Sequence, residues 1–270
     1  MEKKIGFIGS GKMAGAIIKG LIKTGFTHSD NILATKSNPN GLQEKSKELG
    51  VKIILDNKLL IQNSDIIFIS VKPNQVLDVL ADIKPFITKE KLIVSIAAGV
   101  NINKIETNLP SGTKVIRVMP NTPALVGEGM SGLVGGSEAR TEDIEYIKSL
   151  LTTIGKCVVV DSEAQLDIVT AISGSGPAFF YKVINEIARA GEKLGMDYEK
   201  ALLLSIQTAI GSGKMALNRT ISMEELISNV ATKGGCTAVG VDCMNENNSE
   251  KLFFDVIKST TEKAHALGQG

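Results

Sequence analysis

Glycines near the start of the chain have the spacing of a phosphate-binding turn. Gly9, Gly11 and Ala14 form the pattern Gly-x-Gly-x-x-Ala, directly after a short apolar run and at the start of a helical pattern. The first glycine allows a tight turn, and the second lets the backbone approach a pyrophosphate at the helix N-terminus. The alternative is a glycine-rich turn without a ligand. We expect dinucleotide binding by Gly9, Ser10, Gly11, Lys12 and Met13.

The residues after the second predicted strand favour NADPH over NADH. NAD-selective folds place an Asp or Glu about twenty residues beyond the glycines, where it holds the ribose 2′-hydroxyl. Here the segment reads Ala34-Thr-Lys-Ser-Asn38 and has no carboxylate. A cation and two hydroxyls suit a 2′-phosphate, so we expect cofactor contacts from Thr35, Lys36 and Ser37. NADH remains an alternative cofactor, and Lys36 could instead be an ordinary solvated lysine.

Two further strand ends carry small or polar residues. They read Ser70-Val-Lys-Pro73 and Ser95-Ile-Ala-Ala-Gly99. Ligands of open α/β sheets lie outside the carboxyl ends of the strands, so these segments are placed to line the nicotinamide side of a cofactor. The expected cofactor contacts here are Val71, Lys72, Ala97 and Ala98.

Few residues could serve as a general acid or base. The chain has two histidines, His28 and His265, and neither belongs to a polar cluster in the sequence. We therefore expect both to be surface residues. A C=N substrate that arrives protonated needs no acid, because hydride addition to an iminium carbon leaves a neutral amine. Such a reaction needs positioning and a clamp for an anionic substrate.

A glycine break late in the chain could supply that clamp. The segment Thr232-Lys-Gly-Gly-Cys-Thr237 interrupts a helical pattern. Successive backbone N–H groups in a glycine turn that leads into a helix form an anion-binding concavity. A second glycine run, Ser173-Gly-Ser-Gly-Pro-Ala178, predicts a loop at the mouth of the site and a helix that starts at Pro177.

The elements that position these motifs change type along the chain. Apolar strands alternate with short helices in the first part, which predicts a mostly parallel sheet covered on both faces. From Glu163 onward almost every segment has a helical pattern. We expect an α/β Rossmann-type domain at residues 1–161 and an all-α domain at residues 162–270. The expected strands are Ile5–Ile8, Asn31–Thr35, Val51–Ile54, Asp65–Val71, Lys91–Ile96, Lys114–Val118, Met130–Val134 and Cys157–Val160.

Composition argues against several other classes of protein. The net charge of +1, the aromatic content of 4% and the absence of Trp are not typical of nucleic-acid binding. Three cysteines without a Cys-x-x-Cys pair, with two histidines, argue against a disulfide framework and a zinc site. With no signal peptide and no membrane-spanning run, we expect a cytoplasmic protein without metal or membrane partners.

Together these motifs resemble those of the pyrroline-5-carboxylate reductase family over essentially the whole chain. The similarity is carried, in order, by Gly6–Ala14, Val71–Pro73, Ser95–Gly99, Arg117–Pro123, Ser173–Ala178 and Gly234–Thr237. It implies NAD(P)H-dependent reduction of 1-pyrroline-5-carboxylate to L-proline. It also implies a Rossmann domain, a helical domain that forms homodimers, and dimers that can assemble into rings.

The resemblance also implies roles for individual residues. Thr237 would offer its hydroxyl to the ring nitrogen as the catalytic residue, and the substrate carboxylate would bind the turn. The implied substrate contacts are Glu163, Thr232, Gly234, Gly235, Cys236 and Thr237, and the implied nucleotide contacts include Thr35, Asn57, Lys72, Ala98 and Asn229. The chain departs from the family pattern at Lys233, where a proline is usual, and at Cys236, where Thr or Ala is usual.

Two alternatives stay open on the sequence alone. One is a β-hydroxyacid-dehydrogenase-type enzyme, which would use a lysine and an asparagine on a helix such as Lys182 and Asn185. The other is a non-catalytic NADPH-binding protein on the same scaffold.

Overall fold

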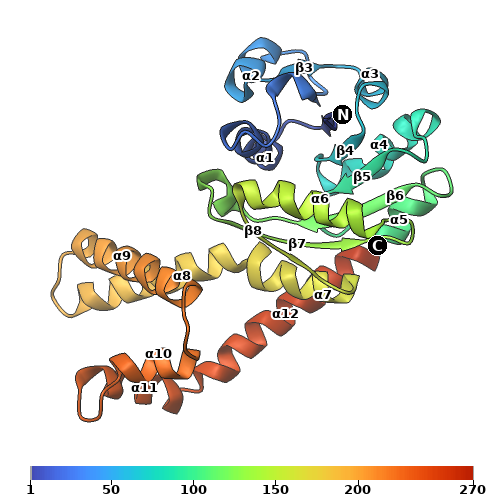
Figure 1. Cartoon of the computed structure of the whole chain (residues 1–270). Helices are drawn as coiled ribbons and strands as arrows, with labels where there is room; N and C mark the ends of the chain where they lie inside the picture. Colours follow the sequence, from blue (N-terminus) through green and yellow to red (C-terminus); the bar gives the residue numbers. More distant parts are fainter. Residues whose placement is uncertain (1, 270) are drawn as a thin grey trace. The chain divides into compact units, whose positions relative to one another are not determined.

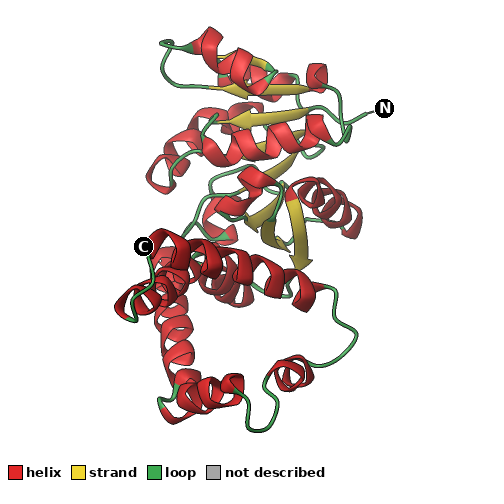
Figure 2. Cartoon of the chain, turned by 90° about the vertical axis from the view of Figure 1, so that its left-hand side faces the viewer, coloured by secondary structure: helices red, strands yellow, loops and turns green. Residues whose placement is uncertain are grey.

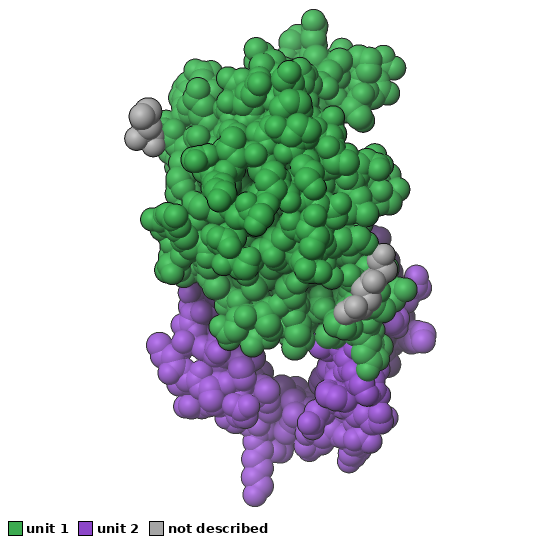
Figure 3. All heavy atoms as spheres, turned by 90° about the vertical axis from the view of Figure 1, so that its right-hand side faces the viewer, with its two compact units in different colours: residues 1–175, 259–270 green, residues 176–258 purple. Residues whose placement is uncertain are grey.

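The protein is described by a computed structural model over residues 2–269. Contacts divide the chain into unit 1, residues 1–175 and 259–270, and unit 2, residues 176–258 (Figure 3). These units are defined by contacts in space, and unit 1 includes both ends of the chain. The domain boundary after residue 161 is defined along the sequence and stays a prediction. No helix among the described residues is long and apolar enough to cross a membrane.

Unit 1 is built on one eight-stranded sheet in the order β3-β2-β1-β4-β5-β6-β7-β8. Strands β1 to β6 are parallel, β7 is antiparallel to β6, and β8 is parallel to β7. The predicted mostly parallel sheet is therefore confirmed. The strands are β1 (Ile5–Ile8), β2 (Ile32–Thr35), β3 (Lys52–Ile54), β4 (Ile66–Ile69), β5 (Leu92–Ser95), β6 (Lys114–Met119), β7 (Gly129–Gly135) and β8 (Gly155–Val159).

Helices cover both faces of this sheet (Figures 1 and 2). One face packs against α1 (Lys12–Lys23), α2 (Leu42–Leu49) and α6 (Thr141–Leu151). The other packs against α3 (Asn57–Gln62), α4 (Val76–Ile83), α5 (Ile102–Thr107) and α7 (Glu163–Val169). Neighbouring residues of one strand enter different cores, as Phe68 and Ile69 do, so a central strand such as β4 is apolar at every position.

Short 3₁₀ turns occur in several connections of unit 1. They span Ser29–Asn31, Pro73–Gln75, Lys84–Phe86, Thr122–Val126 and Thr152–Ile154.

Helices α3 and α6 each have a local signal in the sequence. Asp56 accepts a hydrogen bond from the backbone N–H of Leu59 at 3.1 Å and so caps α3. Helix α6 carries Ile144, Ile147 and Leu150 at intervals of three residues, which is a helical spacing.

The predicted loop at Ser173–Ala178 is wrong, because all of this segment except Ser175 is helical, whereas the predicted helix start at Pro177 is confirmed to within one residue. A π-helical segment, Thr170–Gly174, follows α7, and the N–H of Ser175 donates to the carbonyl of Thr170 at 2.8 Å. Helix α8 then begins at Gly176. A π-bulge takes up one extra residue while the backbone groups remain hydrogen-bonded, so the glycines do not break the helical run.

Unit 2 is entirely helical apart from its connections. It contains α8 (Gly176–Lys193), α9 (Tyr198–Leu217), α10 (Met223–Val230), α11 (Cys236–Glu246) and the first part of α12 (Ser249–Gln269). Helices α8 and α9 pack side by side and are joined by two hydrogen bonds. Tyr198 Oη donates to Asn185 Oδ1 at 2.8 Å, and Ser205 Oγ donates to the carbonyl of Ile184 at 3.0 Å.

Candidate active site

A cleft of about 390 Å³ lies at the carboxyl ends of β1, β2 and β4. The strand order reverses between β1 and β4, and ligands of open α/β sheets bind at such a switch point. The cleft brings together nine of the residues predicted to bind the cofactor: Gly9, Ser10, Gly11, Thr35, Lys36, Ser37, Asn57, Val71 and Lys72.

The two motif glycines are needed for different physical reasons. Gly9 has a φ of +96°, and a Cβ there would lie 2.8 Å from the carbonyl oxygen of Ser70. A Cβ on Gly11 would meet no atom within 4 Å, so this position faces open space. Gly11 caps α1 without a side-chain hydrogen bond, which leaves the N-terminal N–H groups of α1 available to an anion.

Hydrogen bonds fix the floor of the cleft. Thr35 Oγ1 accepts from the N–H of Gly9 at 3.4 Å and donates to Asn57 Oδ1 at 2.9 Å. Asn57 Nδ2 donates in turn to Asp82 Oδ2 at 3.0 Å. The ends of β1 and β2 and the start of α3 are thus linked through side chains. Thr35 is buried, so its hydroxyl acts here as a brace for the glycine turn.

The polar groups of the cleft suit an anionic ligand. Lys36 and Lys72 line it, and no Asp or Glu lies among the described residues that form its wall. The Lys36 ammonium donates to the carbonyl of Asn40 within its own loop. Ser70 Oγ is buried and has no hydrogen-bond partner. An unpartnered hydroxyl, two cations and an open glycine turn together fit the phosphates and sugars of a dinucleotide.

Other predicted cofactor residues lie outside the wall of this cleft. Lys12 and Met13 begin α1, and Ala97 and Ala98 lie in the connection after β5, with Ala97 buried and Ala98 exposed. Asn229 lies in α10 of unit 2. A larger hollow, of about 720 Å³, lies at the amino ends of β1, β2 and β3. Ligands of parallel sheets bind at the carboxyl ends of the strands instead.

The predicted substrate turn lies in unit 2 immediately before α11. The N–H of Gly235 donates to the carbonyl of Thr232 at 2.9 Å, and Gly234 has a φ of +78°. This hydrogen bond and the positive φ at the third residue define a type II turn. Gly235 caps α11 without a side-chain hydrogen bond, and Thr237 is half-buried at the second position of the helix.

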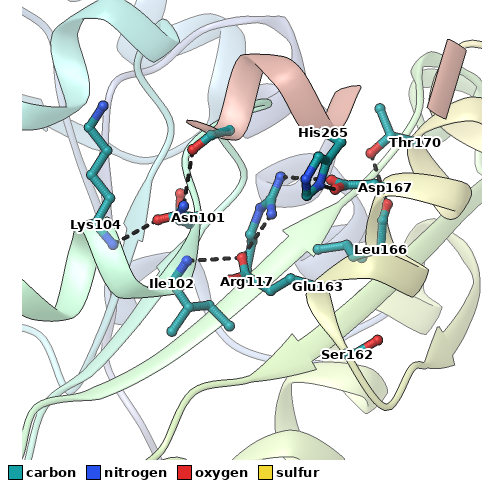
Figure 4. Close-up of polar contacts among 12 residues, drawn as sticks. Asn101, Ile102, Lys104, Arg117, Ser162, Glu163, Leu166, Asp167, Thr170 and His265 are labelled. Atoms are coloured by element: carbon teal, nitrogen blue, oxygen red, sulfur yellow. Dashed lines mark hydrogen bonds and ion pairs between the residues drawn. The ribbon is translucent and has the colours of Figure 1, made fainter. Parts of the chain in front are cut away.

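Glu163, which the family resemblance places near the substrate, has partners within the chain (Figure 4). It lies in the first turn of α7 and accepts from Arg117 Nη1 at 2.8 Å and from the N–H of Ile102 at 2.9 Å. Arg117, on β6, is only 4% exposed. Its Nη2 lies 3.8 Å from Asp167 Oδ1.

His265 is exposed, as expected of a surface histidine, but it also belongs to a polar cluster. Its Nδ1 lies 3.2 Å from Asp167 Oδ2, so it joins Arg117, Glu163 and Asp167 in one charge cluster (Figure 4). These residues are far apart in the sequence, and spacing alone could not group them. Arg117 within an apolar strand is the one usable signal, because a buried arginine requires carboxylate partners.

The three cysteines are free thiols. Burial raises the pKa of Cys157 to about 12, which makes this thiol unreactive. Cys236 and Cys243 are exposed on α11. Among residues 2–269, no group of three or more His, Cys, Asp and Glu side chains could hold a metal ion.

The residues of the β-hydroxyacid-type alternative form local contacts on α8. Lys182 Nζ pairs with Glu186 Oε1 at 2.9 Å on the exposed face of the helix. Asn185 accepts the hydrogen bond from Tyr198 described above. Lys182 and Asn185 therefore do not contact each other through a polar bond.

Comparison with known proteins identifies the family. Residues 163–267 match the family model for pyrroline-5-carboxylate reductase dimerisation, and residues 4–99 match a model described as NADP oxidoreductase, coenzyme F420-dependent. The pyrroline-5-carboxylate reductase of Methanosarcina acetivorans is 38% identical over 268 residues and covers 99% of both chains. Pyrroline-5-carboxylate reductase 2 of Bacillus subtilis is 35% identical, over 97% of this chain and 94% of its own.

Solved structures agree with this match. The pyrroline-5-carboxylate reductase of Coxiella burnetii superposes with a TM-score of 0.93 at 32% identity, over 98% of each chain. The Plasmodium falciparum enzyme, solved with NADP bound, gives a TM-score of 0.85 at 31% identity, over 99% of this chain and 98% of its own. With an NAD(P)-binding Rossmann domain followed by a helical dimerisation domain, this chain belongs to the pyrroline-5-carboxylate reductase family.

Proposed function

We propose that this chain, a pyrroline-5-carboxylate reductase by family, reduces 1-pyrroline-5-carboxylate to L-proline with NADPH bound in the cleft at β1, β2 and β4. The observation that carries the proposal is this cleft at the switch point. It gathers the glycine turn, two lysines and an unpartnered buried hydroxyl, and no carboxylate lines its described wall.

The same cleft supports NADPH as the preferred cofactor. Lys36 and Ser37 follow β2, where NAD-selective folds carry an acidic residue. The Lys36 ammonium donates to the backbone carbonyl of Asn40, so it can turn to a phosphate without leaving a carboxylate unpaired. We assign pyrophosphate binding to the N–H groups at Gly11–Met13, and the nicotinamide side to Lys72, Ala97 and Ala98.

The substrate site is assigned to the turn before α11. When bound, NADPH supplies the hydride that is added to the C=N carbon. The N–H of Gly235 closes the turn onto Thr232, and the N–H groups of Gly234 and Cys236 lie in this turn and at the helix N-terminus, an arrangement that favours a carboxylate. Thr237 offers a hydroxyl two residues past the turn glycines and orients the ring nitrogen. No acidic side chain is required, because a protonated imine becomes a neutral amine.

The helical unit supports assembly into at least a homodimer, the state indicated by its family match. Large apolar side chains are exposed on its helices, including Phe180, Leu203 and Phe254. Surfaces of this kind are rarely left in water by a monomeric protein. A ring of dimers is our further proposal for the assembled enzyme.

A cofactor and substrate panel tests the proposal. Purified protein with 1-pyrroline-5-carboxylate should oxidise NADPH faster than NADH at equal concentration and should form stoichiometric proline. Binding of NADPH without turnover of this imine would support the non-catalytic alternative instead. Turnover of a 3-hydroxy acid that is lost in Lys182→Ala would support the β-hydroxyacid alternative.

A further inference from the structure

The loop between β5 and α5 is held at several points. We call residues 96–101 the β5 loop; it contains Ala97 and Ala98, which we assign to the nicotinamide side. The N–H of Ile96 donates to the carbonyl of Ile69 at 3.2 Å, which fixes the start of the loop on β4. At its other end, Asn101 Oδ1 accepts from the N–H of Lys104 at 2.8 Å and caps α5.

The end of α12 contacts this loop directly. We call residues 265–268 the C-terminal turn of α12. Asn101 Nδ2 donates to the carbonyl of Gly268 at 3.0 Å. A Cβ on Gly99, which has a φ of +69°, would lie 3.0 Å from the Cβ of Leu267. The backbone of the β5 loop and the C-terminal turn therefore pack against each other at close range.

The charge cluster of Arg117, Glu163, Asp167 and His265 also links the β5 loop to the C-terminal turn (Figure 4). Glu163 accepts the first N–H of α5, from Ile102, and is held in turn by Arg117. One helical turn further along α7, Asp167 contacts Arg117 and His265, the latter on the C-terminal turn. Arg117 thus connects the end of the β5 loop to the end of α12 through two carboxylates on one face of α7.

The burial of Arg117 keeps the side chains of the cluster in fixed positions. Arg117 is almost completely buried, and a buried guanidinium whose partners leave it carries a large desolvation penalty. Its two carboxylates are therefore kept in place.

We infer that the C-terminal turn of α12 clamps the β5 loop for cofactor binding, with Asn101 and His265 as its positioning residues and Arg117 as its anchor. This inference rests on the proposed function, because it takes the β5 loop to contact NADPH. The clamp acts on affinity for the cofactor: a loop that is fixed before binding loses less conformational freedom when the ligand arrives. It does not touch the reacting atoms.

Variants of Asn101 can distinguish the clamp from ordinary helix capping, because its side-chain amide and its side-chain oxygen have different partners. Asn101→Asp and Asn101→Ser both keep an oxygen that can accept from the N–H of Lys104, so α5 stays capped. Neither keeps the amide donor that reaches Gly268. We expect both variants to raise KM and Kd for NADPH about threefold to tenfold, the effect of one lost hydrogen bond, with kcat at saturating cofactor within about twofold of wild type.

His265 provides an independent variant with a matched control. His265→Ala removes the contact with Asp167 and should raise KM for NADPH by a similar factor, whereas His265→Gln keeps a donor and should recover most of the affinity. His28 lies 3.2 Å from Asp30 in an exposed pair remote from the β5 loop. His28→Ala should leave KM unchanged. Hydrogen exchange at residues 96–104 should be faster in the clamp variants with NADPH bound.

The outcomes separate this inference from the proposed function. Unchanged KM and exchange in the Asn101 and His265 variants, with a wild type that binds and oxidises NADPH, would overturn the clamp and leave the function standing. A wild type that binds no NADPH would overturn both. A fall in kcat with unchanged KM would also contradict the clamp, because it would place these residues in the chemical step.

Discussion

At the scale of single residues, we propose that Lys36 discriminates between two cofactors that differ by one phosphate. Lys36→Glu replaces a cation with an anion at the wall of the cleft. The variant should bind NADPH at least about tenfold more weakly, since charged hydrogen bonds are worth about 1.5–3 kcal/mol, while NADH binding changes little. Titration by nicotinamide fluorescence measures both. Lys47→Glu, on α2, is the control, and equal losses for both cofactors would remove Lys36 from the 2′-phosphate site.

Thr237 is the residue to which we assign orientation of the substrate. Thr237→Ala should lower kcat/KM about tenfold to hundredfold, as expected for a lost hydrogen bond to a charged group. Thr237→Ser should recover most of the activity because it keeps the hydroxyl. Steady-state kinetics with circular dichroism would check this. An alanine variant with wild-type kcat and KM would exclude a hydroxyl role at this position.

Cys157 allows a test of burial through its pKa. Because burial raises the thiol pKa from 9.0 to about 12, the native protein should react very slowly with iodoacetamide in mildly alkaline buffer. The same cysteine should label rapidly in urea. The neutral thiol is favoured in the folded state, so this group adds stability below pH 9 that is lost as the pH rises toward 12. Rapid labelling of Cys157 under native conditions would show that β8 is open to solvent.

At the scale of elements, the turn before α11 has a position, Lys233, that could accept a proline. Lys233 is the second residue of the type II turn, a position with φ near −60° that proline favours. Lys233→Pro should raise the free energy of unfolding by about 0.4–1 kcal/mol and lower KM for the imine, because the turn is more rigid before binding. Thermal unfolding and kinetics measure both effects. Gly234→Ala, at a φ of +78°, should do the opposite.

Most elements could be predicted because their signals are local. The strands of unit 1 are apolar runs bounded by glycines and polar residues, and helix α2 ends at Gly50 with a φ of +72°. The π-helical segment at Thr170–Gly174 could not be predicted in this way. Its Ser-Gly-Ser-Gly-Pro sequence has the composition of a loop, and only packing around it determines that the backbone stays helical.

At the scale of the whole molecule, unit 2 has far more exposed apolar surface than its own helices can cover. Among the described residues, a Cβ at Gly211 or Gly213 of α9 would meet no neighbouring atom within 4 Å, so this part of α9 faces open space. A second chain that packs on α9 would explain both observations, in agreement with the dimerisation match.

A charge placed on α9 tests that assembly. Leu203 is 67% exposed, and Leu203→Asp should shift the protein toward monomer and lower its activity. Sedimentation velocity measures the shift. Leu77, 40% exposed on α4, is the control, and Leu77→Asp should leave the association state unchanged. A Leu203→Asp variant that sediments as wild type would place the interface elsewhere.

By itself, the sequence determined the dinucleotide turn, the succession of strands and helices, and the glycine turn before α11. Each of these depends on residues within a few positions of one another, whose conformational preferences act locally. Only the tertiary structure decided the partners of Glu163 and His265. Arg117 meets Glu163 across 46 residues and Asp167 meets His265 across 98, and such pairs form only when sheet register and helix packing bring them together.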